Sequence, residues 1–266
     1  MRKKVFQIVL ILLLVMASAS CADRLEGYNQ ETGYVYVRYG SYPQRIDGGI
    51  VGVPEQTWVW RSQYNKDHFT NLSLLNYEKE PILWRVLSVD DEKVFLCSEY
   101  VLFASSLNTD KGEYADVEGD FIYTDLHRLL NGDFYNYAFN EDEQKSILPD
   151  EYYGNVYLLS VDELKDKALG FGAESKRNAW STEIAVRIYG TFVYQKDSKC
   201  ASPYWTRTPS KNPGAGLRVK QGGKIGYYAC MYDECGVRPV INLKRGSYTI
   251  TAGTGTIEDP YILDAK

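Results

Sequence analysis

The sequence contains little of what enzymes commonly use for acid–base chemistry. It has two histidines, His68 and His127, in 266 residues. The patterns G-x-S-x-G and H-E-x-x-H do not occur, and neither do the phosphate-binding loop or the calcium loop of EF-hands. The shortage of histidine counts against hydrolysis, which usually needs a positioned histidine or carboxylate. We interpret His127, in a predicted helix, as structural and His68, in a polar loop, as exposed.

An excess of positive charge is also missing. Lysine and arginine number 30 against 35 aspartates and glutamates, which gives a net charge of -5. Nucleic-acid binding needs a basic surface, so we expect no nucleic-acid partner. The acidic clusters at 90–92, 116–120 and 233–234 are typical of solvated loops. We predict no metal site and no cofactor.

One long apolar run is present, at the N-terminus. Arg2, Lys3 and Lys4 precede the run 5–17, and small residues lead to Cys21. This pattern predicts a secretory signal over residues 1–20. Ala19-Ser20-Cys21 resembles a lipobox, which implies lipid attachment at Cys21, whereas cleavage after Ala19 is the alternative. Loss of residues 1–20 lowers the net charge to -8, which keeps an exported protein soluble.

The cysteines allow more than one interpretation. If Cys21 is acylated, four remain in an oxidising compartment, and four cysteines permit three pairings. Cys97 lies in an apolar strand and is typical of a buried free thiol. A disulfide is predicted among Cys200, Cys230 and Cys235, without a choice of pair. Zinc is disfavoured because C-x-x-C pairs are absent.

Tyrosine is abundant and gives the better functional lead. It supplies 23 of the 37 aromatic residues. Tyrosine and tryptophan offer rigid contact area with a polar group, which suits recognition of sugars or protein surfaces. High β-propensity explains the same tyrosines without a ligand. The candidate ligand-binding residues are Trp58, Trp60, Arg207, Arg218 and Tyr232.

Local patterns predict an α+β fold in a single domain, with antiparallel strands and short helices in the middle of the chain. Two β-rich runs around Asp90-Asp91-Glu92 predict a hairpin. Short helices are expected at 125–131, 134–138, 140–147, 160–170 and 182–189. Strands are expected at 34–39, 82–89, 93–97, 156–159, 204–207, 216–219, 225–229 and 237–243. We read Trp84 and Trp205 as core residues, and Arg85, Arg207 and Arg238 as buried ion-pair partners or the floor of a pocket.

The order of these segments resembles the DUF6273 family, a domain of unknown function found in exported or surface proteins of bacteria. The matching stretches are YGSYPQ at 39–44, PILWRVL at 81–87, LNGDF at 130–134, AF at 138–139, VYLLS at 156–160, WTRTP at 205–209 and GVRPVI at 236–241. The resemblance covers residues 34–245. The polar composition of residues 21–33 predicts a tether before this domain. Residues 246–266 form a predicted C-terminal extension, in which GTGTIEDPYIL resembles a closing motif of bacterial surface proteins.

A more distant resemblance links the tryptophan-arginine and glycine-valine-arginine segments to C-type-lectin-like domains and formylglycine-generating enzymes. It implies a lectin-like architecture by analogy of fold. We therefore expect an exported, lipid-anchored surface module that binds a glycan or a protein and has no catalytic activity. The alternatives are a thiol enzyme of the formylglycine-generating type, with Cys230 and Cys235 as its redox pair, and a purely structural envelope protein.

Overall fold

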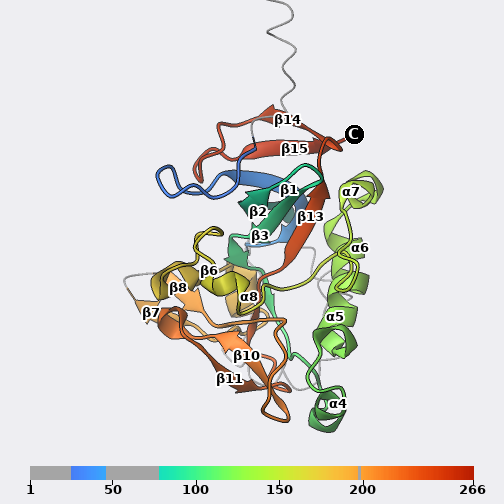
Figure 1. Cartoon of the computed structure of the whole chain (residues 1–266), viewed down its shortest axis with the longest axis vertical. Helices are drawn as coiled ribbons and strands as arrows, with labels where there is room; N and C mark the ends of the chain where they lie inside the picture. The colour runs from blue at the N-terminus through green and yellow to red at the C-terminus, as the bar shows by residue number, and fades with distance from the viewer. Residues whose placement is uncertain (1–24, 46–77, 197–198) are drawn as a thin grey trace, which may run out of the picture.

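The computed structural model describes residues 25–45, 78–196 and 199–266. The strands in it are β1 (Tyr36–Pro43), β2 (Lys79–Val89), β3 (Lys93–Ser98), β4 (Tyr100–Val101), β5 (Phe103–Ala104), β6 (Ala179–Ser181), β7 (Tyr194–Lys196), β8 (Lys199–Ser202), β9 (Tyr204–Trp205), β10 (Ala215–Val219), β11 (Ile225–Ala229), β12 (Gly236–Val237), β13 (Val240–Lys244), β14 (Tyr248–Ala252) and β15 (Tyr261–Ala265). The helices are α4 (Lys111–Asp116), α5 (Asp125–Leu129), α6 (Tyr135–Ala138), α7 (Glu141–Ser146) and α8 (Glu183–Arg187), with a π-helical turn η3 (Leu130–Phe134) and 3-10 turns η2 (Phe121–Tyr123), η4 (Glu163–Lys165), η5 (Glu174–Arg177) and η6 (Gln221–Gly223). The predicted α+β class is confirmed (Figure 1).

The main sheet has six strands in the order β13-β3-β2-β1-β15-β14. The predicted hairpin is confirmed as β2 and β3, which pair antiparallel. Its turn is stabilised by Asp90, whose carboxylate accepts hydrogen bonds from the backbone N–H groups of Glu92 and Lys93. This local bonding by an aspartate is what makes such a short acidic stretch a good turn.

Both ends of the described chain belong to this sheet region. β15 pairs parallel with β1 and antiparallel with β14, so residues 246–266 complete the sheet. Leu25 is buried, and the N–H of Tyr28 donates to the carbonyl of Leu87. The segment 25–33 therefore packs on the domain instead of standing away from it.

Two smaller sheets lie beside the main one. The five-stranded sheet has the order β11-β10-β9-β12-β5, and the four-stranded sheet has the order β4-β6-β8-β7. β10 and β11 lie together at one end of the molecule, whereas β14 and β15 lie at the opposite end (Figure 1). This arrangement leaves β11 as an outermost strand.

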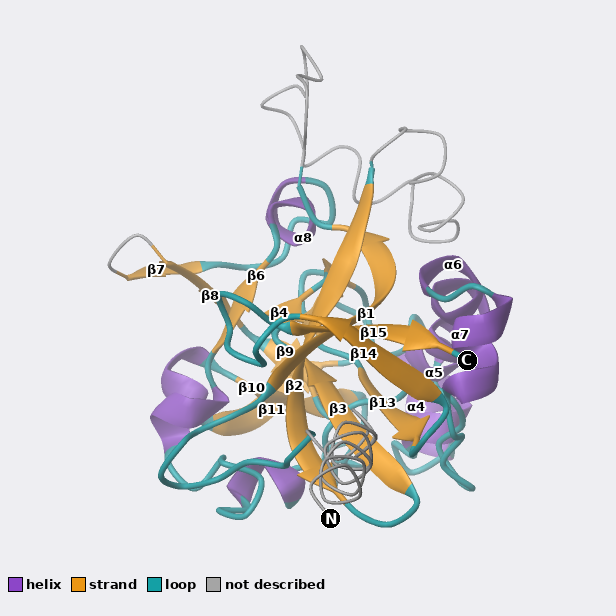
Figure 2. Ribbon diagram, turned by 90° about the horizontal axis from the view of Figure 1, so that it is seen from above, coloured by secondary structure: helices purple, strands orange, loops and turns teal. Residues whose placement is uncertain are grey.

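The central helices agree with prediction and lie together on one side of the sheets (Figure 2). Thr124 caps α5 through a bond from the N–H of His127, and Asn140 with Glu143 forms a capping box on α7. Each cap satisfies an N–H that the first helical turn leaves free. α8 begins after Thr182, as predicted, but ends at Arg187. α4 was not predicted.

Three predictions of local structure are wrong. The strand expected at 237–243 is divided into β12 of the five-stranded sheet and β13 of the six-stranded sheet, with Pro239 between them. Residues 156–159 form only one isolated bridge, from Tyr157 to Val240, after which the carbonyls of Leu158 and Leu159 accept from the side chain and the backbone N–H of Arg207. The helix expected over 160–170 is a single 3-10 turn, η4. Its capping box does form, but the Asp166 carboxylate accepts from the N–H of Ala168. That local bond replaces the next helical turn.

The core agrees with the interpretation of the two tryptophans. Trp84 and Trp205 are both fully buried. The Trp84 indole N–H donates to the Tyr39 carbonyl at 2.7 Å, and that of Trp205 donates to the Ser105 carbonyl at 2.8 Å. Buried indoles need such partners, so these bonds fix each ring in its orientation.

Candidate functional site

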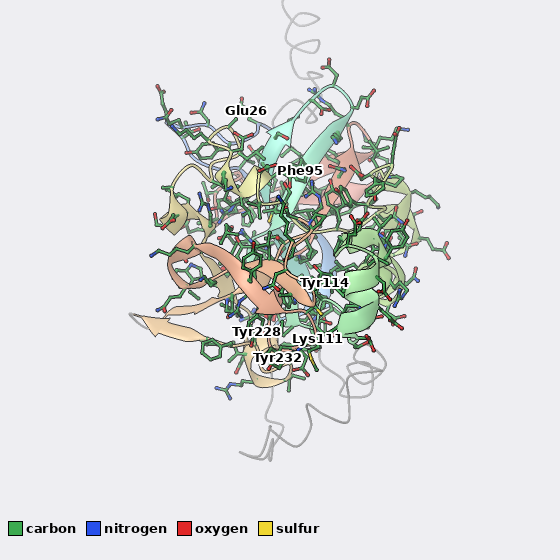
Figure 3. The ribbon with its side chains drawn as sticks, turned by 60° about the horizontal axis from the view of Figure 1, so that its bottom comes forward. Glu26, Phe95, Lys111, Tyr114, Tyr228 and Tyr232 are labelled. Atoms are coloured by element: carbon green, nitrogen blue, oxygen red, sulfur yellow. The ribbon has the colours of Figure 1, made fainter. Side chains whose placement is uncertain are left out.

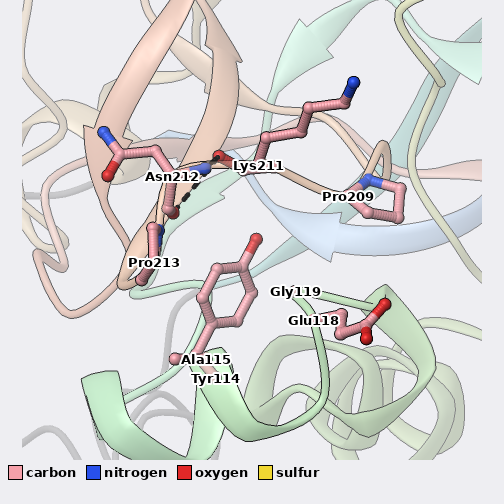
Figure 4. Close-up of a pocket in the computed structure, with 9 residues that line it drawn as sticks. Tyr114, Ala115, Glu118, Gly119, Pro209, Lys211, Asn212 and Pro213 are labelled. Carbon is pink, nitrogen blue, oxygen red and sulfur yellow. Dashed lines mark hydrogen bonds between the residues drawn. The ribbon is translucent and has the colours of Figure 1, made fainter.

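A cleft of about 500 Å³ opens between α4 with the turn that follows it and the loop 209–213 (Figure 4). Its lining residues are Tyr114, Ala115, Glu118, Gly119, Pro209, Ser210, Lys211, Asn212 and Pro213. Pro209 and Pro213 stiffen the loop, and the Ser210 hydroxyl accepts from the N–H of Asn212. The cleft therefore has a well-defined loop as one wall.

Tyr114 lies deep in this cleft and is 1% exposed. Its hydroxyl has no hydrogen-bond partner among the described residues, and burial raises the pKa of Tyr114. Gly119 lies so close that a Cβ there would come within 2.9 Å of the hydroxyl oxygen. Glu118 and Lys211 are exposed and bring opposite charges to the lining. Sequence analysis missed this cleft, for which the proline-flanked loop was the only signal.

Three side chains at and just after the end of β11 form what we call the tyrosine surface: Tyr228, Met231 and Tyr232. Met231 is 42% exposed and Tyr232 is 47% exposed. Tyr227 is 55% exposed on the other face of β11, because successive side chains of a strand point to opposite faces. Tyr228 is partly buried, and its ring centroid lies 5.2 Å from that of Tyr232. Tyr228 and Tyr232 lie at the same end of the molecule as Lys111 and Tyr114 of α4 (Figure 3). The cleft and the tyrosine surface therefore share one end.

Arg218 supports this surface from beneath. Its guanidinium carbon lies 3.4 Å from the centroid of the Tyr228 ring, and Trp205 packs on the same ring at 5.9 Å. The Tyr228 hydroxyl donates to the Glu234 carboxylate. Burial, followed by this bond to Glu234, raises the pKa of Tyr228. Of the predicted ligand-binding residues, Arg218 and Tyr232 are thus brought into one cluster.

Arg207 takes part in a different set of contacts. Its guanidinium pairs with Glu163 and lies 4.6 Å from the Tyr153 ring and 5.2 Å from the Tyr157 ring. Its side chain is 12% exposed. Arg207 therefore anchors η4 and the 156–159 segment to the strand β9. The other predicted ligand-binding residues, Trp58 and Trp60, lie outside the described residues, as do His68 and Cys21.

Arg85 and Arg238 are the buried ion-pair partners that their motifs predicted. Arg85 contacts the Glu99 carboxylate at 2.6 Å, and Arg238 lies 4.0 Å from the same oxygen. Arg238 also donates from Nε to the Ser98 carbonyl at 2.7 Å. Two buried cations sharing one carboxylate tie β2, the β3–β4 junction and the residues before β13 together.

The predicted disulfide involving Cys230 or Cys235 is absent from the structure. Both are buried free thiols, as is Cys97. Burial raises the pKa of Cys230, and it raises that of Cys235 to about 12 despite the nearby Arg218. The side chain of Cys200 lies outside the described part of the chain. Raised pKa values are the reverse of what a reactive thiol needs.

Three further observations concern metal binding, His127 and membrane spans. Within the described residues, no group of three or more histidine, cysteine, aspartate or glutamate side chains is arranged to hold a metal ion. His127 is half-buried, and its Nε2 lies 3.0 Å from the Tyr153 carbonyl. No helix among the described residues is long and apolar enough to cross a bilayer.

Taken together, the fold and the site define an α+β domain with an open sheet edge and an aromatic surface at one end. The family model for the domain of unknown function DUF6273 matches residues 91–245, more than half of the chain. The chain belongs to this family. No curated protein and no solved structure matches it. The more distant resemblance to lectin-like domains and formylglycine-generating enzymes stays a prediction.

Proposed function

We propose that this protein is a non-catalytic, lipid-anchored surface module that binds a glycan or protein ligand through the tyrosine surface. The observation that carries the proposal is the support beneath the exposed rings. Tyr232 packs on Tyr228, and Tyr228 is held by Arg218, Trp205 and Glu234. Rings ordered before binding lose little conformational entropy when a ligand arrives.

The cleft beside Tyr114 extends this binding surface. Its lining combines the apolar rings of Pro209 and Pro213 with the charged side chains of Glu118 and Lys211. Binding sites commonly combine an apolar lining with a few polar groups that orient the ligand. A ligand seated on the tyrosine surface is expected to continue toward this cleft, because both features lie at one end of the molecule.

The absence of catalysis is proposed from the state of the candidate groups. Cys230 and Cys235 are buried, and their pKa values are raised. The thiolate is the nucleophile in thiol enzymes, so these cysteines are poorly suited to the chemistry of formylglycine-generating enzymes. Burial lowers the pKa of His127, and its Nε2 contacts the backbone carbonyl of Tyr153. We interpret this contact as structural.

Export and anchoring are proposed from the N-terminal sequence. The signal-like residues 1–20 and Cys21 carry this part of the proposal. We expect wild-type protein expressed in a bacterium to incorporate radiolabelled palmitate and to sediment with membranes. Cys21→Ser is expected to abolish both, and labelling of that variant equal to wild type would contradict the anchor.

Ligand binding is tested with a printed oligosaccharide array and with a phage-displayed library of random peptides. The probe is the soluble protein from residue 23 onward, whose domain carries every contact described above. We expect a specific binder whose affinity falls at least tenfold in Tyr232→Ala. Ile257→Ala is the matched control, because Ile257 is 39% exposed and belongs to the loop between β14 and β15, two strands that lie at the opposite end of the molecule. Equal losses in both variants, or no binder at all, would reject the proposal.

A further inference from the structure

The strand β11 forms an open edge of the five-stranded sheet. Its neighbour in the sheet order is β10, and no other strand of the described chain pairs with it. An open edge presents a row of unpaired backbone N–H and C=O groups that another strand can use. What matters is which residues of β11 present those groups.

The hydrogen bonds at both ends of the hairpin settle this question. The N–H of Cys230 donates to the Gly214 carbonyl, and the N–H of Lys220 donates to the Lys224 carbonyl. In an antiparallel pair, residues that bond to the partner alternate with residues that bond away from it. Gly226 and Tyr228 therefore face β10, and Ile225 and Tyr227 direct their backbone groups outward.

The sequence of β11 lacks the usual protection of an edge. Natural edges carry a charge, a proline or a bulge that discourages pairing, and Ile225–Ala229 has none of these. The ring of Tyr227 is 55% exposed on this edge. The edge is also continuous with the tyrosine surface, because Tyr228 belongs to both. In strand addition the unpaired backbone of an exposed edge supplies affinity, and the side chains beside it supply selectivity.

Lys220 indicates which side chains the added strand would carry. Its side chain lies over Gly226, where a Cβ would meet Nζ at 2.7 Å. Lys220 has no ion-pair partner within the described residues, and Lys224 is exposed next to it. A residue placed opposite Gly226 would emerge beside the Lys220 ammonium, so an acidic side chain fits there. The adjacent position would lie beside Tyr227, where a β-branched or aromatic side chain fits.

We propose that β11 binds an extended segment of a partner protein by β-strand addition, with an acidic residue opposite Gly226 and a β-branched or aromatic residue opposite Tyr227. This inference rests on the proposed function and names its ligand class as a peptide. The backbone of Ile225 and Tyr227 supplies the affinity, and Lys220 with Tyr227 supplies the selectivity.

The test follows backbone amides by hydrogen exchange and NMR, with synthetic twelve-residue peptides selected from the phage library as the probe. In the free protein, the amides of Ile225 and Tyr227 are expected to exchange much faster than those of Gly226 and Tyr228. Saturating peptide is expected to slow exchange at Ile225 and Tyr227 at least tenfold and to leave Gly226 and Tyr228 little changed. Protection without this alternation would overturn strand addition.

Two variants separate the backbone from the side chain. Tyr227→Pro removes one outward N–H at a position where an edge strand tolerates proline, and we expect it to abolish peptide binding. Tyr227→Ala keeps that N–H and is expected to weaken binding about tenfold. Lys220→Glu leaves the backbone intact and is expected to weaken binding of acidic peptides at least tenfold, so the inference stays testable even if the proline variant unfolds. Peptide binding unaffected by Lys220→Glu in a folded protein would overturn the assigned acidic position.

Failure of this inference is distinguishable from failure of the proposed function. A glycan bound in a Tyr232-dependent way, with no peptide selected, would keep the function and overturn strand addition. Protection of Ile225 and Tyr227 that rises with protein concentration in the absence of peptide would point to a second copy of the chain and also overturn the proposal. Loss of all binding would overturn both.

Discussion

Arg207 and Glu163 lie 44 residues apart in the chain, and both terminal guanidinium nitrogens of Arg207, Nη1 and Nη2, donate to the Glu163 carboxylate, with Nη2 2.8 Å from Oε1. The same carboxylate accepts from the backbone N–H of Ser160. The Glu163 side chain therefore caps the η4 turn and also anchors that turn to Arg207, which follows β9.

Arg207→Ala is predicted to lower the free energy of unfolding by about 3 kcal/mol, since it strands a partly buried carboxylate. It also removes the cation–π contacts with Tyr153 and Tyr157. Lys145→Ala is the matched control, because the Lys145–Asp142 pair is 69% exposed on both sides and its loss should leave the free energy of unfolding almost unchanged. Urea unfolding measures both variants. Similar losses in the two would show that the Arg207 pair is not structural.

His127 is predicted to make stability depend on pH. Burial lowers its pKa in the folded protein below the ordinary 6.5. The unfolded chain therefore binds a proton first as the pH falls, so stability declines from about pH 6.5 down to the folded pKa and then levels off. His127→Gln, which retains a donor for the Tyr153 carbonyl, is predicted to remove this component. Unfolding free energies measured between pH 7.5 and 5 compare the two proteins, and identical slopes would contradict the prediction.

Two adjacent glycines are predicted to respond very differently to the same substitution. Gly222 and Gly223 have φ values of 76° and 79°, which only glycine adopts readily. A Cβ at Gly223 would lie 1.6 Å from the Glu174 carbonyl oxygen, whereas one at Gly222 meets nothing within 4 Å. Gly222→Ala should cost about 1 kcal/mol, and Gly223→Ala about 3 kcal/mol or more, because only the second displaces η5. Thermal unfolding measures the loss of stability in each variant, and equal losses in Gly222→Ala and Gly223→Ala would refute the prediction.

The buried thiols are predicted to be unreactive in the folded protein. Cys97, Cys230 and Cys235 are buried, and burial raises the pKa of each. Iodoacetamide at pH 7.5 should leave all three unmodified in the native state and alkylate them in urea, as read by peptide mass spectrometry. Rapid native labelling of Cys230 or Cys235 would instead revive the thiol-enzyme interpretation. A mass lower by two hydrogen atoms for the peptides that carry Cys230 and Cys235 would show that a disulfide forms by oxidation of both thiols.

Local features of the sequence predicted much of the fold. The Asp90 turn, the Thr124 cap and the Asn140–Glu143 box each act within three residues, so their side chains find the same partners in any context. The prediction over 160–170 was wrong because the pattern fixed where a helix starts and said nothing of Asp166, whose local bond ends it.

The candidate site was harder to predict, because its parts come from distant segments. Tyr114 and Lys211 line one cleft from positions almost a hundred residues apart, and neither belongs to a recognisable motif. Arg207 and Arg218 looked alike in sequence, but Arg207 binds Glu163 and Arg218 lies under Tyr228. The sequence identifies both residues as arginine, but the partner of each depends on which strands and turns pack beside it in the folded protein.

By itself, the sequence determined the α+β class, the turns and caps, the two buried tryptophans, the family and the excess of tyrosine. These depend on contacts within a few residues or on the choice between apolar and polar side chains. Only the tertiary structure decided that Cys97, Cys230 and Cys235 are unpaired, that Arg85 and Arg238 share Glu99, and that β11 is an open edge among the described strands. Those outcomes depend on which strands become neighbours, and strand order is set by packing of the whole core.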